Sequence, residues 1–273
     1  MTDNKIRFNI KAHNKVAKKY EGHHTQIFNA IEQQRIKEHL AYASSLILSS
    51  SNNKKAFDFG CGSGNITRHL LELGFSVTAA DVAQAFLQMV EKRFNRNDVL
   101  QTTKINGTDL SNISDNSYDL TVSYSVLHHI PEYLPIVQEL IRVTKPGGII
   151  LIDREAAACY WVKSAVFQEF MDSIVKQPPV LSIVRFFKPG TYSNRWQRII
   201  NPRFQPEGDI HVWQDDHIEW DKIKEMFLLH NCKILMENEY LSYDGKYQID
   251  IYNKYKDLCA DDMVMVARKN TSR

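Results

Sequence analysis

Short apolar runs and stretches of helical periodicity alternate over the middle of the chain. The apolar runs, which we expect to form strands, lie at residues 56–59, 76–80, 99–105, 118–123 and 148–152. The stretches with apolar residues at helical spacing lie between them, at residues 66–73, 83–94 and 133–143. Strands that alternate with helices predict an α/β fold, in which helices cover both faces of a largely parallel sheet.

The C-terminal part resumes this pattern after a long interruption. An amphipathic helix is expected at Ile218–His230, and two further strands at residues 233–240 and 263–268, which brings the sheet to seven strands. Residues 218–273 are therefore expected to complete the same domain as residues 51–153. Residues 154–217 are too long for an ordinary connection and are expected to form an insertion after the fifth strand.

Residues 1–50 precede the first strand and have a pattern of their own. Residues 5–21 are rich in lysine and arginine, and Thr25–Leu48 carries apolar residues at helical spacing. We expect this region to form an N-terminal helical cap. Its alternative is a solvated basic helix with surface histidines at His23 and His24.

The glycine turn after the first strand carries the clearest chemical signal. The glycines of residues 60–64 permit positive φ and let a ligand approach the backbone closely, because no Cβ intervenes. Asp81, at the end of the second strand, can accept hydrogen bonds from both hydroxyls of a ribose. Asn65 stands where a dinucleotide site has its third glycine, and Asp58 adds a negative charge that disfavours a pyrophosphate and favours a cationic ligand.

This series of strand, glycine turn, helix, strand and acid resembles motif I of the class I S-adenosylmethionine-dependent methyltransferases, of the quinone, sterol and small-metabolite type. The resemblance covers Lys55 to Asp153 and includes the KPGG turn at residues 145–148. It implies S-adenosylmethionine as the cofactor, and a Rossmann-like seven-stranded sheet that is mostly parallel with one antiparallel strand. The residues that it places at the cofactor are Asp58, Gly60, Cys61, Gly62, Gly64, Asn65, Asp81, Val82, Asp109, Leu110 and Ser123.

The segment after the fourth strand, Ser123–Ile130, reads SYSVLHHI and supplies candidates for acid–base chemistry. Ligands of open α/β sheets bind beyond the carboxyl ends of the strands, so we expect His128 and His129 near the methyl group. A hydroxyl or carbon acceptor needs a base, and histidine titrates in the right range. His128 is the first candidate, followed by His129, His24 and Tyr20, with a structural hydrogen-bonding role as the alternative for each.

The same segment disfavours two methyltransferase types. Nucleic-acid amino-methyltransferases carry an Asn/Asp-Pro-Pro-aromatic motif there, and metal-assisted O-methyltransferases of quinone biosynthesis carry Glu-x-x-Glu-His. Ser125-Val-Leu-His128-His129 keeps only the final histidine of the second motif, so we expect no metal. Residues 211–217 hold two histidines and two aspartates, but aspartate directly before an amphipathic helix is expected to cap it rather than to bind a metal.

The insertion is basic and aromatic over part of its length. From Ser173 to Pro206 its charged residues are all lysine or arginine, interleaved with phenylalanine, tyrosine and tryptophan. If it is a substrate lid, it suggests a small-molecule acceptor that is anionic, lipid-like or sugar-linked. A membrane-surface or nucleic-acid face, and a packed subdomain with solvated arginines, stay open. The alternative functions are an RNA or protein methyltransferase that docks through this lid, and a non-catalytic adenosyl-binding module.

Composition adds weaker bounds. The net charge of +2 and the pI of about 8.2 are too mild to argue for nucleic-acid binding. The four cysteines are isolated in the sequence, which fits a reducing compartment. The chain starts without an apolar signal sequence and has no run of the roughly 20 apolar residues that a bilayer span needs, so a cytoplasmic location is expected. The sequence indicates no oligomeric state.

Overall fold

The structure is a computed structural model that describes residue 21 and residues 24–49, 51–94, 98–175 and 218–271. Several predictions from the sequence concern residues outside these ranges. Tyr20, His23, the basic segment before them, most of the expected lid and the histidine–aspartate group at 211–217 all lie outside the described residues.

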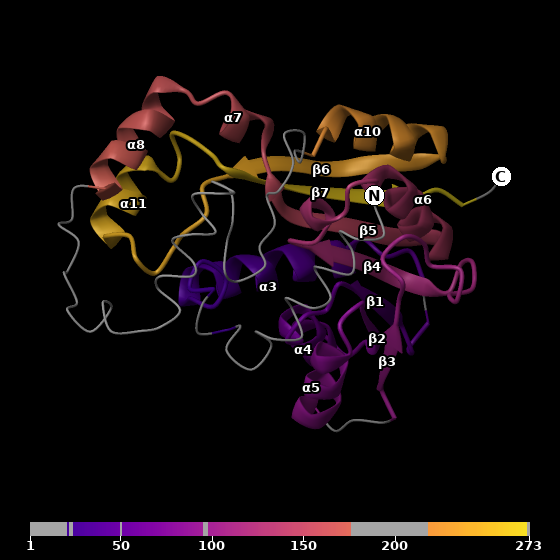
Figure 1. Ribbon diagram of the computed structural model, residues 1–273. Coiled ribbons are helices and arrows are strands. Elements are labelled where there is room, and N and C mark those ends of the chain that lie inside the picture. The colour runs from indigo at the N-terminus through magenta and orange to yellow at the C-terminus, as the bar shows by residue number, and fades with distance from the viewer. Residues whose placement is uncertain (1–20, 22–23, 50, 95–97, 176–217, 272–273) are drawn as a thin grey trace.

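A seven-stranded sheet forms the centre of the protein, with the strand order β3-β2-β1-β4-β5-β7-β6 (Figure 1). The strands are β1 (Lys55–Phe59), β2 (Ser76–Asp81), β3 (Leu100–Lys104), β4 (Tyr118–Tyr124), β5 (Thr144–Ala156), β6 (Cys232–Tyr240) and β7 (Asp262–Lys269). The pairs among β1 to β5 are parallel, whereas β7 runs antiparallel to both β5 and β6. The predicted Rossmann-like sheet with one antiparallel strand is confirmed.

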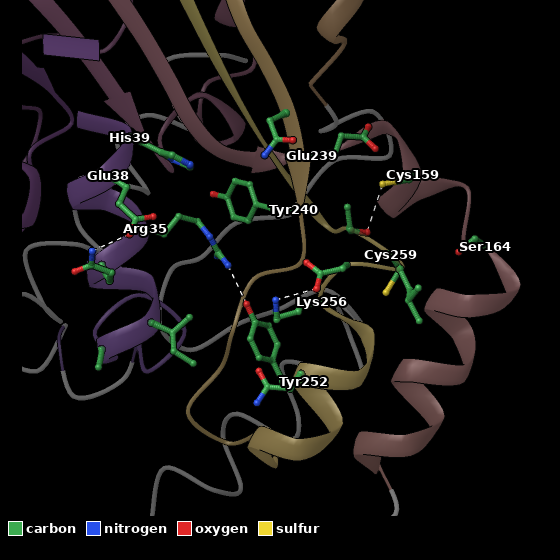
Figure 2. Close-up of a pocket in the computed structure, with 18 residues that line it drawn as sticks. Arg35, Glu38, His39, Cys159, Ser164, Glu239, Tyr240, Tyr252, Lys256 and Cys259 are labelled. Carbon is green, nitrogen blue, oxygen red and sulfur yellow. Dashed lines mark hydrogen bonds and ion pairs between the residues drawn. The ribbon is translucent and has the colours of Figure 1, made fainter. Parts of the chain in front are cut away.

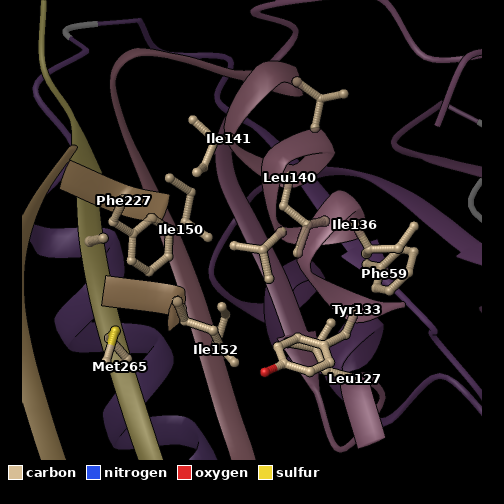
Figure 3. Packing of buried hydrophobic residues seen from close by; sticks show 14 of the residues in the cluster. Phe59, Leu127, Tyr133, Ile136, Leu140, Ile141, Ile150, Ile152, Phe227 and Met265 are labelled. Atoms are coloured by element: carbon tan, nitrogen blue, oxygen red, sulfur yellow. The ribbon is translucent and has the colours of Figure 1, made fainter. Parts of the chain in front are cut away.

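Helices pack on both faces of the sheet. One core joins the sheet to α6 (Tyr133–Val143) and α10 (Trp220–Leu229), and the other joins it to α3 (Ala30–Ser45), α4 (Asn65–Glu72) and α5 (Gln84–Phe94). Figure 3 shows the first core, where Ile136 and Leu140 of α6 and Phe227 of α10 pack over the strands and are fully buried. Burying both faces leaves the strand ends as the place where a ligand can reach the sheet.

The described part of the expected N-terminal cap is built into the main core. Asn29 caps α3 by accepting a hydrogen bond from the amide of Glu32. Ile36 and Leu40 are almost fully buried in the cluster that also contains α4 and α5. The helix is shorter than the stretch Thr25–Leu48 that its periodicity suggested, because residues 24–28 form turns instead.

The fifth strand differs from its prediction at both ends. We expected a KPGG break followed by a strand at residues 148–152, but β5 begins at Thr144 and accommodates this turn as an irregularity in its pairing with β4. It also continues to Ala156, because β7 pairs with it as far as Asp262. Residues 154–156, which we expected in the insertion, are therefore part of β5.

A small layer of helices lies past one end of the sheet, and the first of them begins just after the extended strand β5 ends. It consists of α7 (Ala158–Trp161), α8 (Ala165–Val175) and α11 (Ile249–Tyr255), which gather beyond β6 and β7 (Figure 1). Phe170 of α8 and Tyr252 and Tyr255 of α11 share one buried cluster. Two of these helices, α7 and α8, lie within the range expected for the insertion, and α11 lies between β6 and β7. Within the described part of the chain, none of the helices combines the length and the apolar character that a membrane crossing requires.

Candidate active site

The glycine turn is tied tightly to its neighbouring strand. The amides of Gly60 and Cys61 both donate to the carbonyl of Ala80, at 2.8 and 2.9 Å. The three glycines of the turn all have positive φ, at 72°, 49° and 89°. A Cβ on Gly60 would lie 2.5 Å from the side chain of Val126, whereas a Cβ on Gly62 would meet nothing within 4 Å. The first glycine therefore lets the side chain of Val126 pack against the turn, and the second borders space that the described residues leave open and that suits a ligand.

Two buried acids lie beneath this turn. Asp81 accepts hydrogen bonds from the amides of Gly62 (3.0 Å) and Ala83 (2.8 Å), and burial raises its pKa to about 6. Asp58 accepts a hydrogen bond from the Thr67 hydroxyl, and burial raises its pKa to about 7. A carboxylate has about four acceptor positions, so Asp81 keeps capacity for ribose hydroxyls. Two carboxyl groups that are costly to ionise in a dry site favour a positively charged ligand.

Unused polar atoms around the turn test whether an adenosyl ligand fits. Among the described residues, the amide nitrogen of Asn65 and the hydroxyl of Ser123 are buried and have no hydrogen-bond partner. Buried polar atoms usually have a partner, so two such atoms around the turn fit a site that a polar ligand completes. Cys61 is buried, and burial raises the pKa of its thiol, so it fills the turn and is not an activated nucleophile. These features fit the predicted cofactor contacts, which stay predictions residue by residue.

Two of the residues expected at the cofactor, Asp109 and Leu110, have strong local roles. Asp109 accepts hydrogen bonds within its own loop from Ser111 and Asn106, and these bonds lower its pKa to about 2. Leu110 is fully buried, and its amide donates to Glu139 at 2.9 Å. Asp109 thus orders its own turn, and its contact with the cofactor remains a prediction, as does that of half-buried Val82.

A second turn, after β4, carries the candidate bases. Ser125 has a positive φ of 58°, and a short 3₁₀ helix, η2 (Leu127–His129), follows it. The fully buried carboxylate of Glu155 accepts hydrogen bonds from the amides of Val126 (2.8 Å) and Leu127 (2.7 Å). It also lies 2.7 Å from Nδ1 of His128. Because Val126 contacts Gly60, the histidine turn and the glycine turn abut.

Glu155 is the functional residue that sequence reasoning missed. Its position follows from a bulge in β5, where Arg154 has a φ of 59° and the register with β7 shifts. That bulge turns the carboxylate toward the histidine turn. The sequence contains one signal for this residue, because Asp153-Arg154-Glu155 places acids directly after an apolar strand. We expected Arg154 and Glu155 to belong to the insertion instead.

A cavity of about 270 Å³ begins at the histidine turn. It brings together three of the candidate bases, His24, His128 and His129, while Tyr20 lies outside the described residues. His24 is buried, and its Nδ1 lies 3.0 Å from the side-chain nitrogen of Gln26. The other lining residues are Gln26, Ile27, Ser125, Arg154, Ala156, Tyr160, Trp161, Ile218, Ser242, Asp261 and Asp262. Among the described residues, no group of histidine, cysteine or acidic side chains is placed to hold a metal ion.

A larger cavity of about 1050 Å³ lies elsewhere, between α3, β6 and the segment after α11 (Figure 2). Arg35 and His39 of α3 and Tyr240 of β6 line it. Its lining includes no residue of the glycine turn or of the histidine turn. The cavity of about 270 Å³, and not this larger one, is therefore the one that the candidate bases line.

We expect Gly62→Ala to weaken cofactor binding at least about tenfold, because the added methyl group enters the open space beside the turn. Gly74→Ala is the matched control, since Gly74 also has positive φ (83°) and nothing within 4 Å of an added Cβ. Both variants should lose about 1–2 kcal/mol of stability from the left-handed backbone alone. Calorimetry should then show weakened binding in Gly62→Ala only; equal affinities in the two variants would contradict the placement of the ligand.

We expect Asp58→Asn to flatten the pH dependence of stability of the ligand-free protein. A carboxyl whose folded pKa is raised from 3.8 to about 7 stabilises the fold below its unfolded pKa, and that contribution is lost as the pH rises through 7. At 1.36 kcal/mol per pH unit, the variant should be more stable than the parent at pH 8 by at most about 4 kcal/mol. Urea unfolding at several pH values measures this. Asp221→Asn, at a side chain that is 90% exposed, is the control, and curves for Asp58→Asn that parallel the parent would rule the explanation out.

Comparison with known proteins agrees with this site. Residues 57–152 match the family model of a methyltransferase domain. The chain is 27% identical over 96 residues to the ubiquinone biosynthesis O-methyltransferase of Pseudomonas savastanoi pv. phaseolicola, which covers 35% of this chain and 41% of that protein. It is 31% identical over 121 residues to the 2-methyl-6-phytyl-1,4-hydroquinone methyltransferase of Synechocystis sp., which covers 41% of this chain and 37% of that protein. The matches thus span less than half the length of these relatives.

Solved structures show the same fold over most of the chain. A chain in the complex of the Haloferax volcanii Trm112 methyltransferase activator with a methyltransferase superposes with a TM-score of 0.55, 15% identity and coverage of 97% of this chain and 98% of that chain. A SAM-dependent methyltransferase of Methanosarcina mazei gives 0.50, 16% identity and coverage of 81% and 95%. At such identities these likenesses show the fold alone.

The family match identifies a methyltransferase domain at residues 57–152, and the seven-stranded sheet is the fold that solved methyltransferases share. The cofactor that this match indicates is S-adenosylmethionine, and the glycine turn with its two buried acids fits it.

Proposed function

We propose that the protein transfers the methyl group of S-adenosylmethionine to a small-molecule acceptor bound in the cavity beside His128. The observation that carries this proposal is the contact of the two turns. Val126 packs on Gly60, so the residues that hold the methyl donor and the residues that line the cavity share one boundary. Relatives over part of the chain are named as quinone-type methyltransferases, which supports a small-molecule acceptor here.

His128 has the geometry of a general base. A carboxylate can only accept, so the 2.7 Å contact with Glu155 requires Nδ1 of His128 to carry the hydrogen. In the neutral ring this leaves Nε2 as the proton acceptor. The hydrogen bonds that the amides of Val126 and Leu127 donate to Glu155 fix the carboxylate against this turn, so little reorganisation is needed when a proton arrives.

The side chains of the protein have separate roles in the proposed methyl transfer. S-adenosylmethionine supplies an electrophilic methyl group on a sulfonium. The buried carboxyls of Asp58 and Asp81 stabilise positive charge and ribose hydroxyls beneath the glycine turn. The cavity orients the acceptor, and His128 takes the proton that the acceptor hydroxyl or amine loses, while Glu155 stabilises the imidazolium that forms.

Transfer of label from methyl-radiolabelled S-adenosylmethionine tests this proposal. The protein is incubated with a small-molecule extract and, separately, with total RNA and with protein. We expect label in the small-molecule fraction, lost in His128→Asn. Label only in RNA or protein would favour a macromolecular methyltransferase, and cofactor binding without any labelled product would favour a non-catalytic adenosyl-binding module.

A further inference from the structure

Side chains along β5 alternate between the two cores until the strand reaches Asp153. Ile152 belongs to the core that contains α6 and α10, and Leu151 belongs to the core that contains α3. Asp153 continues this alternation, since its carboxylate lies 2.7 Å from Nδ1 of His39 on α3. Regular alternation would also turn Glu155 toward α3, away from the histidine turn.

The strand does the opposite because it contains one extra residue. The register with β7 shifts between Asp153 and Glu155, so Arg154 is the extra residue of a β-bulge. Glu155 is then paired with Met263, whose side chain belongs to the core that contains α6 and α10. Its carboxylate therefore emerges on that face, where it contacts the ring of His128. The bulge thus decides whether the candidate base has its partner.

The backbone of Arg154 has a conformation that favours glycine. Its φ is 59°, in the left-handed region that side chains with a Cβ rarely adopt. In one common type of bulge this position is a glycine, because glycine takes the left-handed conformation without strain. A residue with a larger side chain persists in such a conformation when the surrounding structure holds it there.

A buried acid of α3 holds the side chain of Arg154. Its Nη1 lies 3.1 Å from Glu32, and the two side chains are 7% and 1% exposed. Glu32 is itself fixed, because it accepts hydrogen bonds from the amide of Tyr243 at 2.7 Å and from Arg35 at 2.5 Å. Asp262 lies farther from the guanidinium of Arg154, at 3.7 Å. Because separating a buried charge from its partner is costly, the ion pair with Glu32 fixes Arg154 and the backbone that carries it.

We propose that the ion pair between Glu32 and Arg154 holds the bulge of β5 and thereby positions Glu155 against His128. Glu32 and Arg154 are positioning residues, since they act on the proton of the acceptor only through Glu155 and His128. This inference rests on the proposed function and adds two residues to it. It also gives α3 a part in the chemistry, because Glu32 lies in the first turn of that helix.

The variant Glu32→Gln tests this proposal, because it removes the charge of the partner and keeps its size. NMR of the imidazole nitrogens, at a pH where the ring is neutral, shows which nitrogen of His128 carries the hydrogen, and His128→Asn assigns the signals. We expect the hydrogen on Nδ1 in the parent protein, where Glu155 accepts it, and a shift of the population to Nε2 in Glu32→Gln.

Kinetics provide the second measurement on the same variant. For the acceptor found by labelling, kcat should fall about 10–100-fold in Glu32→Gln, while the affinity for S-adenosylmethionine stays unchanged. Glu38→Gln is the matched control, because it removes the same charge from an exposed position of α3. It should change neither the tautomer of His128 nor kcat.

Two substitutions of Arg154 test the same link without touching Glu32. Arg154→Ala and Arg154→Gly both remove the guanidinium, but glycine adopts the left-handed conformation without strain and alanine does not. We expect Arg154→Gly to keep the hydrogen on Nδ1 of His128 and Arg154→Ala to shift it toward Nε2. The double variant Glu32→Gln/Arg154→Gly should recover most of the kcat that Glu32→Gln loses.

Each outcome bears on the proposal. An unchanged tautomer in Glu32→Gln, with or without a loss of kcat, would overturn it, because the ion pair then does not act through Glu155. Equal tautomer populations in Arg154→Ala and Arg154→Gly would overturn it as well, and this comparison decides if Glu32→Gln does not fold. The tautomer is measured without an acceptor, so a failure of the proposed function shows separately. A shifted tautomer with an unchanged kcat would support the positioning and contradict His128 as the base.

Discussion

Replacing His128 with asparagine is expected to lower kcat by about 10²–10⁴-fold while cofactor affinity stays unchanged. In the parent protein, Nδ1 of His128 lies 2.7 Å from the carboxylate of Glu155. The side-chain nitrogen of asparagine can occupy the position of Nδ1 and keep this hydrogen bond. The variant therefore removes Nε2, the proton acceptor, with little disturbance of the turn. Initial rates of methyl transfer to the acceptor found by labelling, with calorimetry of the cofactor, measure both quantities.

The conservative change Glu155→Gln sharpens this test. The glutamine oxygen can still accept from the amides of Val126 and Leu127, while its nitrogen donates to Nδ1 of His128. That reversal places the hydrogen on Nε2 and removes the base without removing the ring. We expect a loss of kcat approaching that of His128→Asn, and loss of the rise in rate with pH that a histidine base gives.

Two further histidine variants provide the comparison. His230→Asn, at the end of α10, should leave kcat unchanged. His129→Asn should have a smaller effect than His128→Asn, because it is His128 that Glu155 orients. A larger loss in His129→Asn than in His128→Asn would contradict the assignment of the base.

Gly60→Ala is expected to destabilise the protein by about 2–4 kcal/mol and to abolish measurable methyl transfer. The new Cβ would lie 2.5 and 2.7 Å from the two methyl groups of Val126, on a backbone with a φ of 72°. Neither methyl group of Val126 can move away easily, because the amide of Val126 donates a hydrogen bond to buried Glu155. The clash therefore moves the glycine turn and the histidine turn apart.

A second substitution separates the clash from the backbone strain. Val126→Ala removes both methyl groups, and the nearest remaining atom, its Cβ, lies 3.2 Å away. The double variant Gly60→Ala/Val126→Ala should recover most of the lost stability beyond about 1–2 kcal/mol of left-handed strain. Thermal and urea unfolding of the four proteins measure the coupling, and additive effects of the two substitutions would show that the turns do not depend on each other.

The cofactor half of the site could be predicted because its chemistry is local in sequence. One strand–turn–helix–strand unit contains Asp58, Asp81 and the three glycines of residues 60–64. The backbone geometry of this unit alone requires the role of each. The seven-stranded sheet with one antiparallel strand was implied by the resemblance and is seen in the structure. The bounds of β5 were not predicted, because pairing with the distant β7 extends it past the KPGG turn and past Asp153.

The acceptor half depends on contacts between residues far apart in sequence. Glu155 reaches His128 only because β5 bulges at Arg154, and the cavity joins His24 to Asp262 across almost the whole chain. No pattern within a short stretch of the sequence predicts such pairs.

Calorimetric titration of S-adenosylmethionine into the parent protein and into Asp81→Asn tests the central claim most directly. The account predicts one site per chain in the parent, and an affinity reduced about 10–100-fold in the variant, because a charged acceptor of the ribose hydroxyls is lost at a position that also orders Gly62. Circular dichroism establishes that the variant is folded. No binding by the parent at millimolar cofactor, or equal binding by the folded variant, would contradict the claim that this glycine turn holds the methyl donor.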